Sequence, residues 1–324
     1  MANRSTSKQQ ARKRTERSAS APSRKKTPSR KAKSSKTLAD LNRAAKHVVS
    51  DVERLRGRLF VKWAGGKSKL VPKILELMPA FSGAYHEPFV GGGAVFAALA
   101  SRQHFGNAHL NDLNWELIAA YRAIRENRHE LVHELKKLRG LHDEKTYYLI
   151  RAKKPIEVAK IAARFIYLNK TCFNGLYRVN AKGEFNVPIG SYKNPQIFDE
   201  DVLHWWSKQL QSVKLHAHDF SLAIARAEKG DFIYCDPPYL PKSETGNFTS
   251  YTKEKFGIGE HDHLFRALDS ATEHRVKWML SEGDSPFIRN LFKKYNIHAV
   301  SVQHAIAASG DARGKRRELL ITNY

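Results

Sequence analysis

Cysteine is scarce in this chain, and long apolar runs are absent. The 324 residues include two cysteines, Cys172 and Cys235, which lie far apart in the sequence. Such usage provides no disulfide framework and indicates a reducing compartment. No apolar run approaches the roughly 18 residues of a membrane span, and the N-terminus is basic without the apolar core of a secretory signal. We therefore expect a cytoplasmic protein that is neither secreted nor held in a membrane.

Acidic residues are also few relative to basic ones. Lys and Arg number 56 against 32 Asp and Glu, which gives a net charge of +24. Residues 1–36 hold 13 of the basic residues and one acid, Glu16, and the rest of the chain is basic too. This balance suggests a polyanionic partner such as nucleic acid, although an ordinary basic surface would give a similar composition.

The composition divides the chain into three parts. Residues 1–36 contain no aromatic side chain and too little apolar surface to fold, so we expect a disordered basic tail. The tail either binds DNA non-specifically or merely aids solubility. Residues 37–56 read as a linker or short helix. Residues 57–324 have a globular composition and form the expected folded domain.

Strand and helix patterns alternate along the globular part, which predicts an α/β fold with a mainly parallel sheet and helices on both faces. Helical patterns dominate an insertion at about residues 115–198, expected to be a separate lobe with a β-hairpin within residues 174–195. Strands are predicted at residues 84–89, 108–112, 213–218, 231–235, 276–281, 296–303 and 318–323, and further helices at 94–101, 114–125, 199–211, 220–228, 260–274 and 285–293.

Four consecutive residues, Asp236-Pro237-Pro238-Tyr239, follow an apolar segment that is typical of a buried strand. Two prolines end such a strand and remove two backbone donors. The motif would then lie at the carboxyl edge of the sheet, where ligands bind in open α/β folds. A carboxylate, a carbonyl and an aromatic face suit an exocyclic amino group, but a plain strand-ending turn can look the same.

A glycine-rich turn at residues 87–93 separates another predicted strand from a helix, and Asp112 ends the next strand. Glycines permit positive φ and close approach to a ligand, and a carboxylate at this position can bind ribose hydroxyls. Phe96 stands where the dinucleotide fingerprint needs glycine, which disfavours a nicotinamide cofactor. Asp219 and Phe220 follow a third strand, where they either serve the ligand or simply cap a helix and fill the core.

Two further patterns carry little weight. The segment Gly66-Lys67-Ser68 resembles a phosphate-binding loop, but Val61 occupies the position of its first glycine. Histidines at 216 and 218, and at 261 and 263, have no evident additional ligands, so no metal site is predicted.

Six segments occur in one order: FVKWAGGK at residues 60–67, EPFVGGGAVF at 87–96, NDLN at 111–114, NGLYR at 174–178, GEFNVP at 183–188 and DPPY at 236–239. Over residues 57–324 this order closely resembles the Dam family of DNA adenine-N6 methyltransferases, the α-ordered class that uses S-adenosylmethionine. The resemblance implies a Rossmann-like methyltransferase sheet with an inserted DNA-recognition lobe. It also implies methyl transfer to adenine N6 in double-stranded DNA, with S-adenosylhomocysteine as the product.

The resemblance assigns roles to individual residues. Asp236 and the Pro237 carbonyl would accept hydrogen bonds from the target amino group, with Pro238 completing the motif, and Tyr239 would stack on the flipped base. The donor would be held by Trp63, Lys67, Glu87, Pro88, Phe89, Gly91, Gly93, Asp112, Asp219, Phe220 and Asp236. DNA would be read, within GATC, by Lys62, Phe173, Asn174, Leu176, Arg178, Pro188 and Tyr192. Phe173 keeps the ring that the family often inserts into the DNA stack but offers no hydroxyl.

The implied reaction is a direct displacement at the sulfonium methyl, which needs no metal, no covalent intermediate and no obligate protein partner. Three alternatives stay open: a cytosine-N4 acceptor, an amide nitrogen in a protein, and a non-catalytic DNA-binding protein on the same fold. The basic charge disfavours a protein substrate. The intact Asp236 and glycine turn disfavour a non-catalytic protein.

Overall fold

The computed structural model describes residues 58–102, 105–240, 256–302 and 316–324. The tail at residues 1–36 and the linker at 37–56 lie outside these ranges. All the described residues belong to one compact unit, Ala44–Tyr324. None of the helices in the described ranges is long and apolar enough to cross a membrane.

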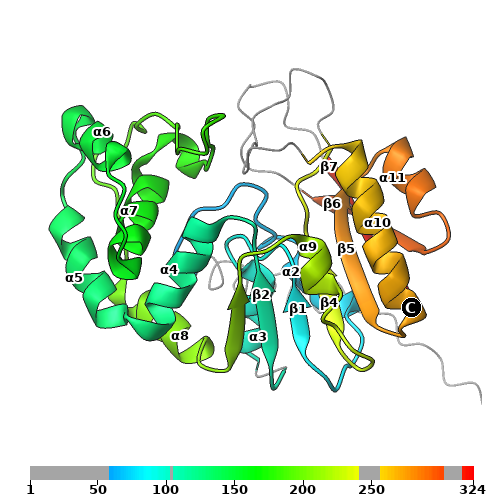
Figure 1. Cartoon of the computed structure of the whole chain (residues 1–324). Helices are drawn as coiled ribbons and strands as arrows, with labels where there is room; N and C mark the ends of the chain where they lie inside the picture. The colour runs from blue at the N-terminus through cyan, green and yellow to red at the C-terminus, as the bar shows by residue number, and fades with distance from the viewer. Residues whose placement is uncertain (1–57, 103–104, 241–255, 303–315) are drawn as a thin grey trace, which may run out of the picture. The chain divides into compact units, whose positions relative to one another are not determined.

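Within the described ranges, seven strands form one sheet in the order β3-β2-β1-β4-β5-β7-β6 (Figure 1). The first five strands in this order are parallel, whereas β7 runs antiparallel to both of its neighbours. The predicted α/β class is confirmed, but the reversed β7 was not foreseen, because residue alternation indicates a strand's faces and not its direction. The strands are β1 Tyr85–Glu87, β2 Ala108–Asn111, β3 Val213–His216, β4 Phe232–Cys235, β5 Lys277–Gly283, β6 Asn296–Val302 and β7 Arg316–Thr322.

The helices agree with the periodicity of the sequence except for α2, a short helix that begins next to Pro72 and buries only Val71 and Ile74. Two buried positions leave too weak a pattern to detect. The helices are α2 Val71–Leu77, α3 Ala94–Ala100, α4 Trp115–Glu126, α5 Arg128–Leu138, α6 Glu144–Ala152, α7 Val158–Thr171, α8 Glu200–Gln209, α9 Phe220–Ile224, α10 Ile258–Glu273 and α11 Pro286–Leu291.

The core lies on both faces of the sheet, as alternation along the central strands shows. Phe232 and Tyr234 of β4 pack in one buried cluster, and Ile233 and Cys235 pack in the other. The first cluster includes side chains of α3, α4, α7 and α8, and the second includes those of α9, α10 and α11. Each buried large side chain contributes roughly 1.5–3 kcal/mol, so β4 is firmly held up to the residue before Asp236.

Helices α5, α6 and α7 gather beyond the β3 edge of the sheet (Figure 1). Arg122 and Arg125 of α4 donate to the carbonyls of Leu215 and Val213, which satisfies acceptors of the edge strand β3. After α7, a short 3₁₀ turn at Phe173–Gly175 leads into irregular chain. The predicted hairpin is reduced there to two isolated antiparallel bridges, Cys172 with Ile189 and Val179 with Phe185.

Candidate active site

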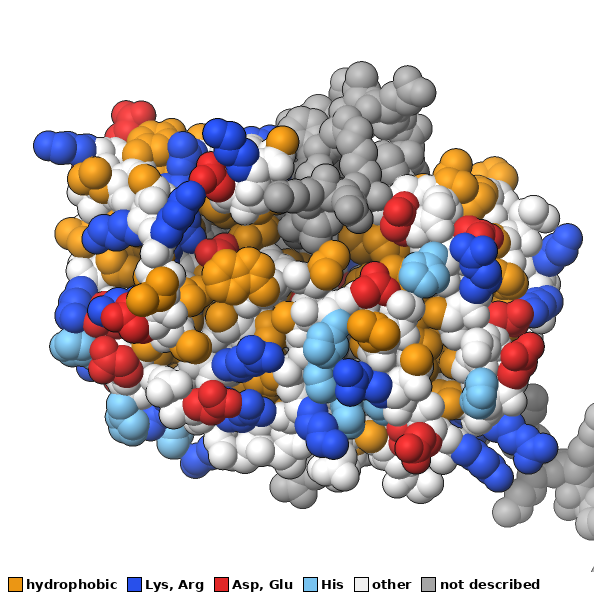
Figure 2. Space-filling view, in the orientation of Figure 1, with side chains coloured by type: hydrophobic (Ala, Val, Ile, Leu, Met, Phe, Trp, Pro, Cys, Tyr) orange, Lys and Arg blue, Asp and Glu red, His pale blue; other side chains and the backbone are white. Residues whose placement is uncertain are grey.

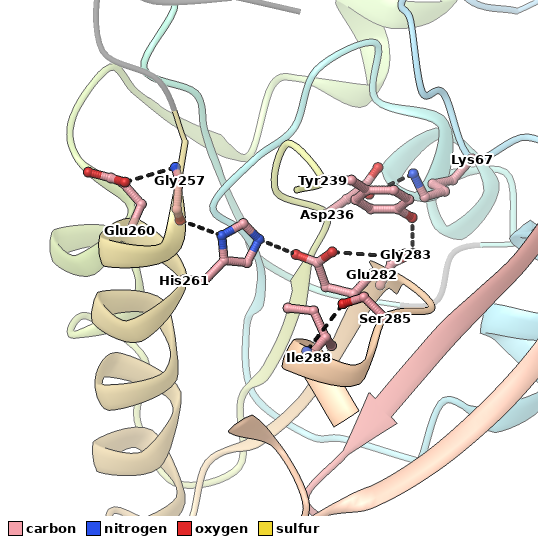
Figure 3. Close-up of polar contacts among 11 residues, drawn as sticks. Lys67, Asp236, Tyr239, Gly257, Glu260, His261, Glu282, Gly283, Ser285 and Ile288 are labelled. Atoms are coloured by element: carbon pink, nitrogen blue, oxygen red, sulfur yellow. Dashed lines mark hydrogen bonds and ion pairs between the residues drawn. The ribbon is translucent and has the colours of Figure 1, made fainter. Parts of the chain in front are cut away.

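Asp236 lies directly after β4, at the carboxyl edge of the parallel strands. Its carboxylate forms an ion pair with Lys67, whose Nζ is 2.6 Å from Oδ1 and 2.8 Å from the Gly65 carbonyl oxygen. The same Nζ lies 4.6 Å from the centre of the Tyr239 ring. The structure thus brings Lys67 to Asp236 and Tyr239, two residues of one motif from which it is far apart in the sequence (Figure 3).

Burial shapes the acidity of this carboxylate. The Asp236 side chain is 19% exposed. Burial is the main cause that raises the pKa of Asp236 to about 6, and the carboxylates of Glu318 and Glu282 add to it. Lys67 acts in the opposite direction. Near neutral pH the ionised form, which can accept hydrogen bonds, is therefore present.

The glycine turn after β1 has the backbone that its sequence requires. Gly91 and Gly93 have φ values of 48° and 69°, in the left-handed region. A Cβ on Gly91 would lie 2.6 Å from the Trp63 indole, and one on Gly93 would lie 2.6 Å from the Tyr121 hydroxyl. Larger residues are therefore excluded at both positions, and Trp63 packs directly on the turn.

Asp112 closes this turn from the neighbouring strand. Its carboxylate accepts hydrogen bonds from the backbone N–H groups of Gly91, at 3.0 Å, and Asn114, at 2.9 Å. Burial raises the pKa of Asp112 to about 6 despite these two donors. Asn111, the first residue of the NDLN segment, donates to the carbonyls of Pro88 and His218 and accepts from the His218 N–H, and so joins the ends of three strands.

Glu87, Pro88 and Phe89 are the other residues of the turn that are predicted to hold the methyl donor. Pro88 is buried, and the side chains of Glu87 and Phe89 face different surroundings. The buried Glu87 carboxylate accepts a hydrogen bond from Tyr85 at 2.8 Å, and burial raises its pKa well above the usual range. Phe89 stacks on Phe220 with ring centroids 5.2 Å apart. Asp219 caps α9 through the Ser221 N–H, so the residues after β3 form both a helix cap and an aromatic wall.

Most of the residues predicted to read DNA lie in the segment 173–192, here called the DNA-reading segment after that prediction. Lys62, from the chain before the glycine turn, places its Nζ 3.9 Å from the centre of the Tyr192 ring. The Arg178 Nε donates to the Asn186 side chain at 2.8 Å. Phe173 is 48% exposed, and Asn174 adopts a left-handed φ of 53°. Leu176 is half-buried and Pro188 is exposed.

Asn169 of α7, which sequence reasoning missed, joins these parts. Its side chain accepts from the Lys62 N–H at 2.8 Å and donates to the Lys62 carbonyl at 2.7 Å and the Gly175 carbonyl at 3.2 Å. A Cβ on Gly175 would approach the Lys62 side chain to 2.6 Å. A polar residue at a buried position of an apolar helix was the one available signal.

A second group of contacts that was not predicted from the sequence links Trp63 to the DNA-reading segment through aromatic and charged side chains. Trp63 stacks on Tyr177 of the DNA-reading segment with ring centroids 6.1 Å apart. The Tyr177 hydroxyl donates to Glu116 at 2.8 Å, and Glu116 also pairs with Arg164 at 2.9 Å. Trp63, which is predicted to hold the methyl donor, is therefore in direct contact with the DNA-reading segment.

Histidines and acids of the described ranges gather as possible metal ligands in one place, at Glu130, His133 and Glu134 on the exposed side of α5. The predicted site residues lie elsewhere. Of the histidine pairs noted in the sequence, His261 is buried and bonded to Glu282, and His216 and His218 lie against each other.

Known proteins resemble this chain over most of its length. Residues 63–306 match the D12 class N6 adenine-specific DNA methyltransferases. The chain is 42% identical over 280 residues to the type II methyltransferase M1.LlaDCHI of Lactococcus lactis subsp. cremoris, covering 82% of this chain and 95% of the relative. It is 40% identical to M.MjaIII of Methanocaldococcus jannaschii, covering 82% and 98%, and 34% identical to DNA adenine methylase of Escherichia coli K12, covering 82% and 95%. The chain therefore belongs to the D12 class of N6 adenine-specific DNA methyltransferases, which are enzymes.

Proposed function

We propose that this methyltransferase takes its methyl group from S-adenosylmethionine and modifies the adenine of GATC in double-stranded DNA. The observation that carries the proposal is the cluster of Asp236, Lys67 and Tyr239 at the end of β4. The glycine turn and Asp112, which bond each other, lie at the ends of the adjacent strands β1 and β2.

The residues around the turn suit each part of the donor. Asp112 is a partly exposed carboxylate at a strand end, suited to ribose hydroxyls. Phe89, Phe220 and Asp219 offer rings and an acceptor for an adenine. The Lys67 ammonium suits the carboxylate of the methionine end, beside Trp63. Bound S-adenosylmethionine would supply an electrophilic methyl group on a sulfonium.

Asp236 and the Pro237 carbonyl would act on the target amino group. Two acceptors for the N6 hydrogens favour a pyramidal nitrogen and stabilise the positive charge that appears when it is methylated. The ionised carboxylate suits this role because it only accepts hydrogen bonds. Alignment of the two reactants would contribute up to ~7–11 kcal/mol.

The adenine must leave the duplex to reach Asp236, at a cost of about 3 kcal/mol. Tyr239 would offset part of that cost, since stacking a base on an aromatic ring contributes roughly 1–3 kcal/mol. Lys67 lies over this ring in the structure. A base that stacks on the same face must therefore displace the ammonium group from the ring.

The DNA-reading segment would supply the sequence preference. Arg178 can donate two hydrogen bonds to guanine O6 and N7, and Lys62 can reach a guanine acceptor from beside the donor site. Leu176 and Pro188 offer apolar contact to a thymine methyl, while Phe173 and Asn174 would enter the stack and Tyr192 would support Lys62. Figure 2 shows Lys and Arg side chains spread across one face, which favours non-specific attraction to phosphates as well.

Sequencing of DNA from cells that express the protein would test the target. The host should lack adenine methylation of its own, and the readout should resolve N6-methyladenine base by base. We expect methylation at GATC and none with Asp236→Ala. Methylated adenines in another sequence would contradict the proposed target. Failure of methyl-labelled S-adenosylmethionine to label DNA would contradict the donor. We also place the enzyme in the cytoplasm, where bacterial or viral DNA is accessible.

A further inference from the structure

The hydroxyl of Tyr239 forms hydrogen bonds with two residues that lie outside the Asp-Pro-Pro-Tyr motif. It donates to Glu318 Oε2 at 2.8 Å and lies 3.1 Å from Ser281 Oγ. Glu318 is 5% exposed and Ser281 is fully buried. Tyr239 is therefore attached at its far end to β7 and β5, whereas its near end follows β4.

The reversed strand β7 makes this contact possible. Glu318 is the register partner of Gly283, the last residue of β5. A Cβ on Gly283 would lie 3.4 Å from the Tyr239 ring, so the ring is seated closely on that backbone. Glu282, beside Gly283, bonds His261 of α10 at 2.9 Å, which fixes the end of β5 in turn (Figure 3).

We propose that Glu318, with Ser281, is a positioning residue that fixes the ring plane of Tyr239 for the extruded adenine. This inference rests on the proposed role of Tyr239 in stacking. A phenol ring held only at Cβ turns about two side-chain torsions, so a bond at its hydroxyl removes that freedom before the base arrives. Such preorganisation lowers the entropy lost when the base binds.

Glu318 also affects Asp236 electrostatically. With Glu282 it raises the pKa of Asp236, beyond the larger effect of burial and against the effect of Lys67. The other ionisable groups of the described residues near this carboxylate are Tyr234, Cys235, Tyr239 and Glu87. Removal of the Glu318 charge should therefore lower the pKa of Asp236, while removal of Tyr239's hydroxyl should leave that charge in place.

Four variants separate the two effects: Tyr239→Phe, Glu318→Ala, the double variant, and Glu318→Gln. The target adenine is replaced by 2-aminopurine, whose fluorescence reports extrusion, and methyl transfer is measured in parallel on normal DNA. Tyr239→Phe and Glu318→Ala should each reduce extrusion and turnover about tenfold, as expected for loss of a bond to a charged group. The double variant should be no worse than either single variant.

Glu318→Gln keeps an acceptor oxygen and removes the charge. Extrusion should stay near the wild-type level, and the acid limb of the pH–rate profile should move to lower pH. A purely structural role for Glu318 would not produce that split between the two readouts. Tyr295→Phe is the matched control, because it removes another tyrosine hydroxyl bonded to a carboxylate, Asp269, away from the site.

Wild-type extrusion in Tyr239→Phe would overturn the proposal, as would losses that multiply in the double variant. If Glu318→Ala does not fold, Tyr239→Phe and Glu318→Gln still decide. The probe is placed at whichever adenine sequencing identifies, so an error in the GATC assignment leaves this test intact. Retained methyl transfer by Asp236→Ala would instead contradict the proposed chemistry.

Discussion

The carboxyl edge of the sheet and the DNA-reading segment are held by different means. At the sheet edge, Asp236 and Asp112 directly follow buried strands; two backbone N–H groups donate to Asp112, and the Lys67 side chain pairs with Asp236. In the segment 173–192, two isolated bridges replace a strand ladder. Scattered backbone hydrogen bonds hold it together, such as that from the Asn186 N–H to the Arg178 carbonyl, and side chains of and next to α6 add to them: Tyr147 donates to the Val187 carbonyl and His142 contacts the Gly190 carbonyl.

This difference suggests that the sheet edge serves the chemical step and the DNA-reading segment serves the recognition of the base sequence. Chemistry requires reacting groups fixed to a fraction of an ångström, which strand ends provide. Readout of a base sequence requires side chains that adapt to DNA, and irregular chain held by single hydrogen bonds of roughly 0.5–1.5 kcal/mol each permits that. Substitutions at the sheet edge should therefore affect turnover, and those in the segment should affect discrimination.

Asp236→Ala should have the largest effect. It removes an acceptor for the target amino group, and we expect methyl transfer to fall by at least ~100-fold. Donor binding and thermal stability should largely survive, since the carboxylate does not hold the sheet together. Tritiated methyl transfer and donor titration measure the two quantities. Asp199→Ala, which removes an exposed helix cap, is the control. Turnover within about tenfold of wild type would contradict the assignment.

Much of the sheet edge was predictable from the sequence, because each of its residues directly follows a strand that the local sequence pattern reveals. Asp112, the glycine turn and Asp236 each follow a strand visible in the apolar pattern. The partners that complete the site were not predictable: Asn169 bonds Lys62 across 107 positions, and Tyr239 bonds Glu318 across 79. Such pairings depend on the reversed β7 and on where α7 packs, which local patterns do not encode.

Arg178→Ala should affect discrimination rather than chemistry. Loss of two hydrogen bonds to one guanine should reduce preference at that base pair by roughly 1–3 kcal/mol, with turnover on saturating target DNA little changed. The measurement compares kcat/KM for GATC with that for sites altered at single base pairs. Equal weakening on every sequence would show that Arg178 contacts only phosphate.

Asn169→Asp should have a smaller effect on the same property. The carboxylate cannot donate to the carbonyls of Lys62 and Gly175, and it places charge beside them. We expect reduced discrimination at the base pair read by Lys62, with donor affinity retained and stability lowered by roughly 1–3 kcal/mol. Combined with Lys62→Ala, the variant should cause no additional loss of discrimination. Asn296→Asp, which alters an exposed bond to the Tyr324 carbonyl, is the control. Additive losses would separate Asn169 from Lys62.

The smallest expected effect is a loss of stability in mild acid that begins in the sheet. His86, His109 and His216 stack across β1, β2 and β3, with ring centroids 4.6 and 5.6 Å apart. Burial, and then neighbouring cations, lower the pKa of His109 and of His216 from 6.5 to about 4. The unfolded chain therefore binds more protons than the folded chain between these pH values, so stability should fall as pH decreases from about 6.5 to about 4.

Hydrogen exchange at several pH values locates this loss. Amides of β1, β2 and β3 should lose protection in that window before the central strands β4 and β5 do. His109→Asn removes one of the titrating rings and should flatten the pH dependence of thermal unfolding, even if it lowers stability at neutral pH. An unchanged slope in this variant, or first loss of protection in the DNA-reading segment, would show that the histidine stack does not govern acid sensitivity. First loss of protection in that segment would also mean that the irregular chain, rather than the sheet, limits the stability of the enzyme in acid.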